Sequence, residues 1–349
     1  MAKVTFFGYK RAMGGLRPLR VQLLAFQDCT AIVPVGLFDL LRKSIELSQV
    51  GPDDASRRRV DLSLIAVGRG RKVTAAGGLE LSCDGALADT APGDAVVVPA
   101  LDPDVMHSLE RNQQVVPWLR QAHHAGSDVL SACTGAFALA EAGLLDGRRA
   151  TTHWAFQQDL QQRYPRVKVE HQAILVDQGR IVTAGGATSF INLAHFLVER
   201  LLGQGIARAA SQMFLIDANK APQGAYAVFS SQKRHGDEAV LRAQELIEAS
   251  PAGVPAMDQL AHAVALSRRT FARRFLAATG NTPREYVQRV RMEAAKRALE
   301  DGKSVAETAE RVGYGDPVAF RKIFVQVVGL TPAEYRARYG PRHHPAWQS

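Results

Sequence analysis

Cysteine is scarce in this chain, and the residue patterns that bind metals are missing. Three cysteines occur in 349 residues, an odd number, and no two of them have the spacing of a zinc site. A disulfide framework is therefore not expected, and reduced thiols indicate a cytoplasmic protein. We expect neither a metal nor another cofactor. The three thiols belong to Cys29, Cys83 and Cys133.

Long hydrophobic runs are absent as well. A helix that spans a bilayer needs roughly 20 consecutive apolar residues, and no run of that length occurs. Residues 1–18 carry several charges and only a short apolar stretch, which does not fit a secretory signal. We therefore expect a short N-terminal extension over 1–18 and no contact with membranes.

Acidic residues are outnumbered by basic ones. The chain carries 43 Lys and Arg against 34 Asp and Glu, a net charge of +9. From Glu238 onward, 17 basic residues stand against 12 acidic ones. A basic protein attracts polyanions, so nucleic acid is a candidate partner. Charge alone does not decide the matter, since many basic proteins bind no DNA.

The first two hundred residues alternate short apolar runs with amphipathic stretches. Strands that alternate with helices predict parallel pairing, and thus an α/β domain with flavodoxin-like layers and a mainly parallel sheet. A hairpin is expected at 173–186, around Gly179, and a helix at 190–203. The expected buried strands are 21–26, 61–67, 94–100 and 127–133, and the expected helices are 34–45, 103–125 and 134–143.

The chain changes character after Gly203. Residues 218–237 are rich in Gly, Ala, Ser and Lys and lack a clean period, which indicates a linker. Helical patterns follow until close to the end of the chain. We therefore expect an α/β domain over 19–205, a linker over 206–237, an all-α domain over 238–338 and a tail over 339–349.

The C-terminal part contains an internal repeat. Residues 266–289 align with residues 315–338 at a constant shift of 49 positions. Upstream the shift drops by one, which predicts that the second copy has a turn one residue longer. So many matches at one offset indicate two copies of one structural unit. Matched pairs include Phe271 with Phe320, Phe275 with Phe324, Gly280 with Gly329, and Tyr286 with Tyr335.

Each copy has the parts of a helix-turn-helix unit, at about 256–278 and 304–328. In the first copy, Ser267 is placed to cap the second helix. In the second copy, Asp316 takes that place and Pro317 holds the first helical position, where a missing N–H costs nothing. The paired phenylalanines would anchor each of these helices to a core.

This arrangement leaves basic and small side chains on the outer face of each second helix. A recognition helix needs such a face, because Arg and Lys contact base edges and phosphates. A helical bundle with a solvated basic face is the simpler alternative, and two copies with matching outer faces argue against it. The outward residues are Arg268, Arg269, Ala272 and Arg273 in the first copy, with Arg274 a further candidate, and Val318, Arg321 and Lys322 in the second.

The repeat resembles the AraC/XylS family of bacterial transcription regulators over about 240–338. The resemblance rests on Val312-Gly313-Tyr314, on the aromatic anchors, and on the closing motif from Gly329 to Arg336. In that family one chain places two recognition helices in successive major-groove segments of double-stranded promoter DNA. The resemblance implies base contacts from Arg269, Ala272, Arg273, Val318, Arg321 and Lys322.

A second motif lies in the first domain. A strand ends at Ala132, Cys133 sits at the turn, and a Gly-containing helix starts at once, as in a nucleophile elbow. A thiol at a helix N-terminus is expected to have a lowered pKa and enhanced nucleophilicity. His153 lies twenty residues on and is placed to pair with it. The simpler alternative is a buried and inert cysteine.

With the run 183–199, this elbow resembles the class I glutamine-amidotransferase-like superfamily, which includes PfpI-type proteases, over about 19–203. The whole chain resembles the GlxA-family regulators. Thr30 stands where catalytic PfpI members carry Glu, and Pro99-Ala100-Leu101 replaces a Gly-Gly pair of the oxyanion site. No third group evidently orients His153, and each lost oxyanion donor costs roughly 10²–10³ in rate. We therefore expect no catalytic residue, and a ligand pocket lined by Cys133, Thr134, His153 and Thr30.

The leading prediction is a ligand-responsive transcription regulator rather than an enzyme. The N-terminal domain would bind a small effector, for which the resemblance suggests a nitrogen-containing metabolite. Two alternatives stay open. One is a cysteine-dependent amidase or protease with an appended DNA-binding domain, and the other is an architectural DNA-binding protein whose α/β domain only dimerises. We expect a homodimer, with RNA polymerase as a further candidate partner.

Overall fold

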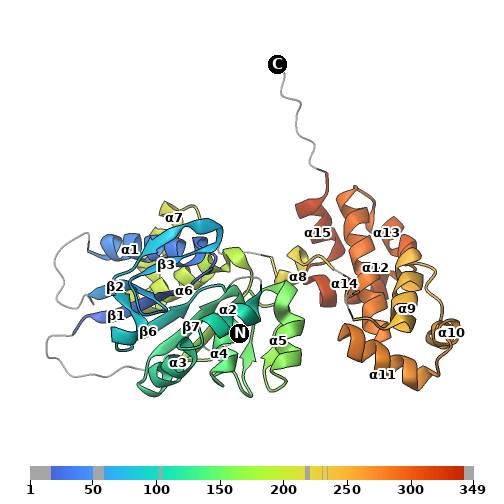
Figure 1. The fold of residues 1–349 in the computed structure, drawn as a ribbon. Coiled ribbons are helices and arrows are strands. Elements are labelled where there is room, and N and C mark those ends of the chain that lie inside the picture. Colours follow the sequence, from blue (N-terminus) through green and yellow to red (C-terminus); the bar gives the residue numbers. More distant parts are fainter. Residues whose placement is uncertain are drawn as a thin grey trace. The chain divides into compact units, whose positions relative to one another are not determined.

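The computed structural model describes residues 17–49, 59–101, 104–216, 221–229, 231–233 and 235–341 (Figure 1). Most of the expected extension, 1–18, and of the expected tail, 339–349, lies outside the described residues. Contacts divide the chain into two compact units. The described residues of the first lie within Met1–Ala142, Gly179–Val182 and Phe190–Ile216, and those of the second within Gly143–Gln178, Thr183–Ser189 and Asp217–Ser349.

The apolar runs of the first half form a seven-stranded sheet. Its strands are β1 (Leu19–Ala25), β2 (Val60–Ala66), β5 (Gly85–Ala86), β6 (Ala95–Val98), β7 (Asp128–Ala132), β10 (Leu175–Asp177) and β11 (Ile181–Ala184). Their order across the sheet is β10-β11-β7-β6-β1-β2-β5. The pairs β1–β2, β1–β6, β6–β7 and β2–β5 are parallel. The predicted α/β class with a mainly parallel sheet is confirmed, as is the hairpin around Gly179.

The central strands are apolar on both faces, as parallel strands covered by helices require. All four residues of β6 are buried, and Leu23 of β1 is only 1% exposed. Helices α1, α6 and α7 contact one another on one face, and α3 packs against α4 on the other (Figure 1). The helices of this unit are α1 (Ile32–Ser48), α2 (Val105–Arg111), α3 (Val115–His124), α4 (Ala136–Glu141), α6 (Phe190–Leu202) and α7 (Gln204–Met213).

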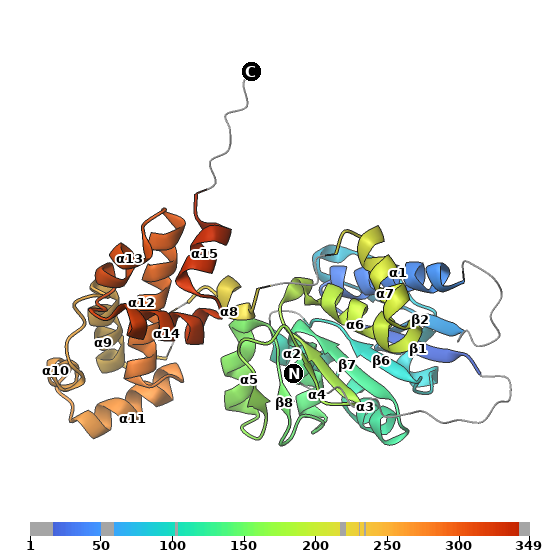
Figure 2. The ribbon, with the colours of Figure 1, turned by 180° about the vertical axis from the view of Figure 1, so that it is seen from behind.

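The sequence pattern does not predict several short elements. They are the hairpin of β3 (Lys72–Thr74) and β4 (Glu80–Ser82), the parallel pair of β8 (Arg149–Ala150) and β9 (Lys168–Val169), and helices α5 (Gln157–Arg163) and α8 (Gln223–Tyr226). Figure 2 shows β8 beside α5. Helices α7 and α8 lie in or overlap the range 206–237, where the sequence indicates a linker. Single 3-10 turns are η1 (Ala76–Gly78), η2 (Leu87–Asp89), η3 (Cys133–Gly135), η4 (Trp154–Phe156) and η5 (Ala187–Ser189).

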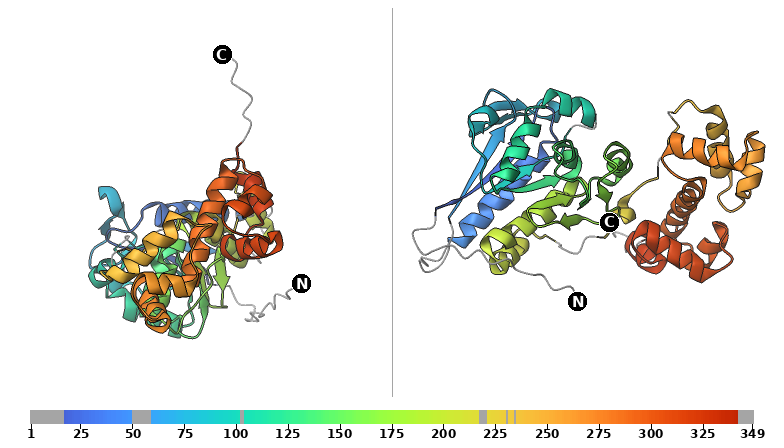
Figure 3. Two further views of the ribbon diagram at one scale, coloured as in Figure 1. Left: turned by 90° about the vertical axis from the view of Figure 1, so that its right-hand side faces the viewer. Right: turned by 90° about the horizontal axis from the view of Figure 1, so that it is seen from below.

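The C-terminal part is all helical, as predicted, and it has two hydrophobic cores. In the right-hand view of Figure 3 the light orange and the red helices form two groups, joined by the long helix α12. One core contains Phe271, Phe275 and Tyr286, and the other contains Phe320, Phe324 and Tyr335. The helices are α9 (Glu238–Ala249), α10 (Met257–Ala263), α11 (Arg268–Thr279), α12 (Pro283–Glu300), α13 (Val305–Arg311), α14 (Pro317–Val328) and α15 (Pro332–Tyr339).

Two further observations cover the described residues as a whole. None of the helices there combines the length and the apolar character that crossing a membrane requires. Within the same residues, His, Cys, Asp and Glu side chains form no group of three or more that is placed to hold a metal ion.

Candidate nucleic-acid interface and candidate ligand site

Helices α11 and α14 begin at the caps that the sequence predicts. The hydroxyl of Ser267 accepts a hydrogen bond from the Thr270 N–H at 3.3 Å. The carboxylate of Asp316 accepts from the N–H groups of Val318 at 2.9 Å and Ala319 at 3.2 Å, and Pro317 follows at the first helical position. These caps satisfy N–H groups that a helix cannot pair internally, and so fix where each helix starts.

The turns that precede these helices differ as predicted. Four residues separate α10 from α11, whereas five separate α13 from α14. A left-handed residue lies in each turn, Ala265 with φ 56° and Gly313 with φ 78°. A Cβ at Gly313 would lie 2.7 Å from the Ala252 carbonyl oxygen, so only glycine fits there. The longer second turn is therefore confirmed, and the glycine of the Val312-Gly313-Tyr314 motif has a steric reason.

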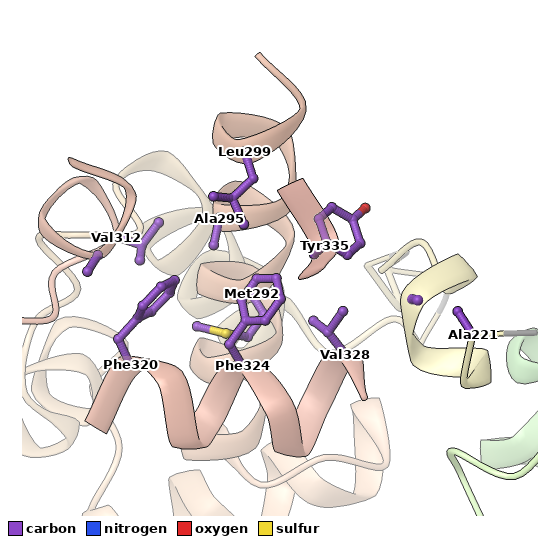
Figure 4. Close-up of a cluster of buried hydrophobic side chains, with 11 residues drawn as sticks. Ala221, Met292, Ala295, Leu299, Val312, Phe320, Phe324, Val328 and Tyr335 are labelled. Atoms are coloured by element: carbon purple, nitrogen blue, oxygen red, sulfur yellow. The ribbon is translucent and has the colours of Figure 1, made fainter. Parts of the chain in front are cut away.

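The inner face of each recognition helix is held by aromatic side chains. In both copies two phenylalanines four residues apart contact each other, and the second contacts a tyrosine of the next helix. Figure 4 shows Phe320, Phe324 and Val328 of α14 facing Met292 of α12. Offset and edge-on aromatic pairs of this kind add to the burial energy and fix orientation. The ring centroids are 5.4 Å apart for Phe271–Phe275, 5.3 Å for Phe275–Tyr286, 5.6 Å for Phe320–Phe324 and 5.7 Å for Phe324–Tyr335.

The outer face of each recognition helix carries the side chains proposed to contact DNA. All of them are exposed, and Val318 is 75% exposed although it is apolar. An exposed valine beside basic residues suits the methyl group of thymine. These exposed residues are Arg268, Arg269, Ala272 and Arg273 on α11, and Val318, Arg321 and Lys322 on α14.

Some basic residues of this domain are committed elsewhere. Arg274, a further candidate for the outer face, forms a two-pronged ion pair with Asp237, the cap of α9, at 2.7 and 2.8 Å. Lys296 of α12 is 6% exposed and donates to the Ala227 carbonyl. Arg268 lies 3.4 Å from Asp258, with both side chains mostly exposed, so that pair is weak. The exposed basic surface therefore contains fewer residues than the number of Lys and Arg in this domain would indicate. Arg274 does not belong to it.

Cys133 has the strained backbone of an elbow. It joins β7 to η3 with φ 56°, a left-handed conformation that non-glycine residues rarely adopt. A Cβ at Gly135 would lie 2.4 Å from the Pro99 carbonyl oxygen, so the turn packs directly on the chain that follows β6. The elbow geometry predicted from the small residues around Cys133 is confirmed.

The lowered pKa predicted for the Cys133 thiol is wrong. Burial raises the pKa of the Cys133 thiol to about 11, although hydrogen bonds with Thr134 oppose that shift. The side chain is only 7% exposed, and the helix that follows, α4, is just six residues long. Desolvation of a thiolate therefore outweighs the favourable field of the helix N-terminus. At neutral pH the thiol stays protonated, and a protonated thiol is a poor nucleophile.

The segment after β6 stands where the resemblance leads one to expect a Gly-Gly pair of the oxyanion site. Its carbonyl groups accept hydrogen bonds from the Thr30 N–H, at 3.3 Å from Ala100, and from the Thr134 hydroxyl, at 2.9 Å from Leu101. Thr30 and Thr134, both predicted to line a pocket, are thus brought to neighbouring positions of this segment. Carbonyl oxygens do not stabilise a developing oxyanion.

His153 is the fourth predicted pocket residue and belongs to the second unit. Burial lowers the pKa of its imidazole, so the ring is neutral at pH 7. Its Nδ1 accepts a hydrogen bond from the Ala155 N–H at 3.1 Å. A neutral ring that accepts through Nδ1 carries its proton on Nε2, which then acts as a donor rather than as a base.

A cavity of about 220 Å³ opens in the first unit, and sequence reasoning missed all of its residues. It is lined by Asp28, Asp104, His107, Ser108 and Arg111. Asp28 follows β1 with φ 63° and pairs with Arg111, while Asp104 caps α2 by accepting from the His107 N–H at 3.2 Å. The Ser108 side-chain oxygen is buried and has no hydrogen-bond partner. No local pattern reveals this cavity, because two segments far apart in the chain, at Asp28 and at 104–111, contribute to it.

Comparisons with known proteins place the chain in a family. A model of the DJ-1/PfpI family matches residues 21–200, which is more than half of the sequence. The chain belongs to the DJ-1/PfpI family. In this DJ-1/PfpI-family chain, a helix-turn-helix domain model matches residues 260–338. The predicted architecture, a glutamine-amidotransferase-like domain fused to an AraC-type helix-turn-helix domain, is confirmed.

Relatives of the DJ-1/PfpI-family chain include regulators and an enzyme. The transcriptional regulator CdhR of Pseudomonas aeruginosa is 29% identical over 77% of this chain and 79% of its own length. The transcriptional regulator GlxA of Rhizobium meliloti is 30% identical over 64% of this chain and 69% of its own length. An isonitrile hydratase of Pseudomonas putida is 31% identical over 45% of this chain and 68% of its own length. The predicted resemblance to GlxA-type regulators is confirmed.

Proposed function

We propose that this chain is a sequence-specific, DNA-binding transcription regulator whose N-terminal domain responds to a small nitrogen-containing metabolite. Its class is the AraC type, which the helix-turn-helix match and the regulator relatives support. The observation that carries the proposal is the pair of recognition helices α11 and α14. Both are capped, anchored by aromatic side chains, and basic on their exposed outer face.

The proposed DNA contacts come from Arg269, Ala272 and Arg273 on α11 and from Val318, Arg321 and Lys322 on α14, with Arg268 beside them. Arg pairs with the O6 and N7 atoms of guanine through two hydrogen bonds, which requires a free guanidinium at the helix surface. We further propose 19–205 as the sensor domain and 238–338 as the DNA-binding domain, a homodimer as the working form, and RNA polymerase as a further partner.

The dependence of binding on salt tests the DNA-binding half of this proposal. Affinity of the full chain for a random-sequence duplex should fall steeply as salt rises, by about 0.9 in log K per log salt for each phosphate contact. Lys322→Ala should reduce that slope by about one contact. Arg163→Ala removes an exposed arginine of α5 and serves as the matched control, with an unchanged slope. A flat dependence for the unmodified chain contradicts the proposal.

The cavity beside α2 supports the effector half of the proposal. Two carboxylates and one guanidinium line it, so these three groups together carry a net negative charge. Arg111 pairs with Asp28, and the Asp104 carboxylate lies at the same cavity. An ammonium group would add a charge-assisted hydrogen bond to a carboxylate that lines the cavity. Thr30, Cys133, Thr134 and His153 are not among the residues that line this cavity, and their contact with an effector stays a proposal.

Small amines test the effector site directly. In titration calorimetry, the full chain should bind n-butylammonium with higher affinity than n-butanol, its neutral analogue. Asp104→Asn should weaken binding by about tenfold, because one charge is lost while asparagine still caps α2. Glu110→Gln removes the same charge from an exposed position of the same helix and should change affinity by less than about twofold. Equal affinity for the amine and the alcohol contradicts this site.

The isonitrile hydratase relative makes an enzymatic function the second candidate. The strained elbow at Cys133 favours it, whereas the raised thiol pKa and the carbonyl-lined segment after β6 oppose it. Purified chain should therefore turn over neither isonitriles nor amides. Turnover that Cys133→Ala abolishes would establish the enzyme and displace the sensor proposal.

A further inference from the structure

A buried glutamine connects helix α8 with the loops around His153 through hydrogen bonds. Gln223 of α8 is 2% exposed, although glutamine is mostly found at surfaces. Its Nε2 donates to the Thr151 hydroxyl at 2.9 Å, to the Thr152 carbonyl at 3.1 Å and to the Ala173 carbonyl at 2.7 Å. Its Oε1 accepts from the Gly186 N–H at 3.2 Å. Every polar atom of the buried amide is therefore used.

A second glutamine continues these contacts to the end of α14. The Gln172 side chain accepts from the Gly224 N–H at 3.1 Å and donates to the carbonyls of Val327 at 2.8 Å and Gln326 at 3.2 Å. Carbonyl groups in the last turn of a helix have no partner within the helix, so Gln172 supplies one. Ala221 and Ala225 pack into the same hydrophobic core as Val328 (Figure 4).

Three glycines permit these close contacts. A Cβ at Gly185 would lie 2.1 Å from the Gln223 Nε2 atom, and a Cβ at Gly224 would lie 2.5 Å from the Val327 carbonyl oxygen. A Cβ at Gly329, which caps α14, would lie 2.6 Å from Pro222. A larger residue at Gly185 or Gly329 would have to displace Gln223 or Pro222, and one at Gly224 would clash with the backbone of α14.

We propose that Gln172 and Gln223, here called the glutamine junction, are positioning residues that couple the loops around His153 to helix α14. A Cβ at Gly186 would lie 3.7 Å from the His153 ring, so the loop that Gln223 grips also borders a proposed effector residue. A change in these loops shifts or releases Gln223, and the end of α14 moves with it. The inference rests on the proposed function, because it assigns the contacts through which effector binding would change the position of Arg321 and Lys322.

Hydrogen exchange of the full chain tests the junction without DNA or effector. Gln223→Leu keeps a side chain of similar size and removes all four hydrogen bonds. Exchange should rise about fivefold or more at the Gly186 amide and at the last amides of α14, including Gly329, because the hydrogen bonds that hold these segments are lost. The equivalent amide of α11, Gly280, should stay protected. Gln212→Leu, at an exposed position of α7, is the matched control and should leave all of these amides unchanged.

Gln172→Leu tests the contacts with α14 independently of those with Gly186. It also keeps the proposal testable if Gln223→Leu folds poorly. It should raise exchange at the end of α14 while the Gly186 amide stays protected. If Gln223→Leu changes Gly186 alone, or neither variant changes α14, Gln223 merely anchors α8 and the proposal is overturned. Both variants should also weaken binding to an operator by threefold or more, on the order of the loss expected for a less preorganised helix. Absence of DNA binding in the unmodified chain would reject the proposed function and leave the exchange result standing.

Discussion

All three cysteines are buried, and in each of them burial raises the pKa of the thiol. Cys133 combines this chemistry with a left-handed backbone, so the chain keeps the shape of a nucleophile elbow without an activated thiol. The carbonyl groups of Ala100 and Leu101, in the segment where the resemblance leads one to expect a Gly-Gly pair, accept hydrogen bonds from Thr30 and Thr134. At the residue scale, the elbow backbone is therefore present while the thiol that it carries is not activated.

Alkylation kinetics check the state of the Cys133 thiol. A thiol with a pKa of about 11 is roughly one part in ten thousand thiolate at pH 7, so iodoacetamide should label Cys133 far more slowly in the folded chain than in urea. Below the pKa, the labelling rate should rise about tenfold per pH unit. Because the folded pKa exceeds the unfolded value, the thiol also contributes stability that is present below about pH 9 and lost toward pH 11. Rapid labelling at pH 7, with no further rise at pH 8, contradicts this picture.

At the scale of elements, regular patterns in the sequence predicted the structure well. The apolar runs that form β1, β2, β6 and β7 are largely buried, as their composition predicts. The caps at Ser267 and Asp316 mark helix starts through local chemistry. The repeat predicted both helix-turn-helix units and the longer second turn. These features depend on residues that are close in sequence, and for that reason sequence alone reveals them.

Features that depend on residues far apart in the chain could not be predicted from the sequence. Strands β8 and β9 are two residues long, too short for any period, and α8 lies in a stretch that resembles a linker in composition. The pKa of Cys133 was predicted with the wrong sign, because its burial is set by tertiary packing rather than by the helix that follows. The cavity beside Ser108 and the contacts of Gln223 join segments far apart in the chain.

At the scale of the whole molecule, the two copies of the helix-turn-helix unit are similar in build and different in chemistry. Helix α11 presents three arginines, at 268, 269 and 273, whereas α14 presents Val318 with Arg321 and Lys322. Arginine reads guanine through paired hydrogen bonds, and a compact lysine charge suits phosphate. The two halves of an operator should therefore be read by different rules, the first mainly through bases and the second through a thymine methyl and the backbone.

The most direct test of this DNA-binding mechanism is a binding profile of the full chain across a library of single-base operator variants. The unmodified chain should show base preferences in two separate segments of the operator. Arg273→Ala should flatten the preference in one segment, at roughly 1–3 kcal/mol per lost guanine contact, while Lys322→Ala should weaken all sequences by similar factors. A chain without any base preference, or an Arg273→Ala variant that loses affinity uniformly and keeps the original preference, would contradict direct readout by α11.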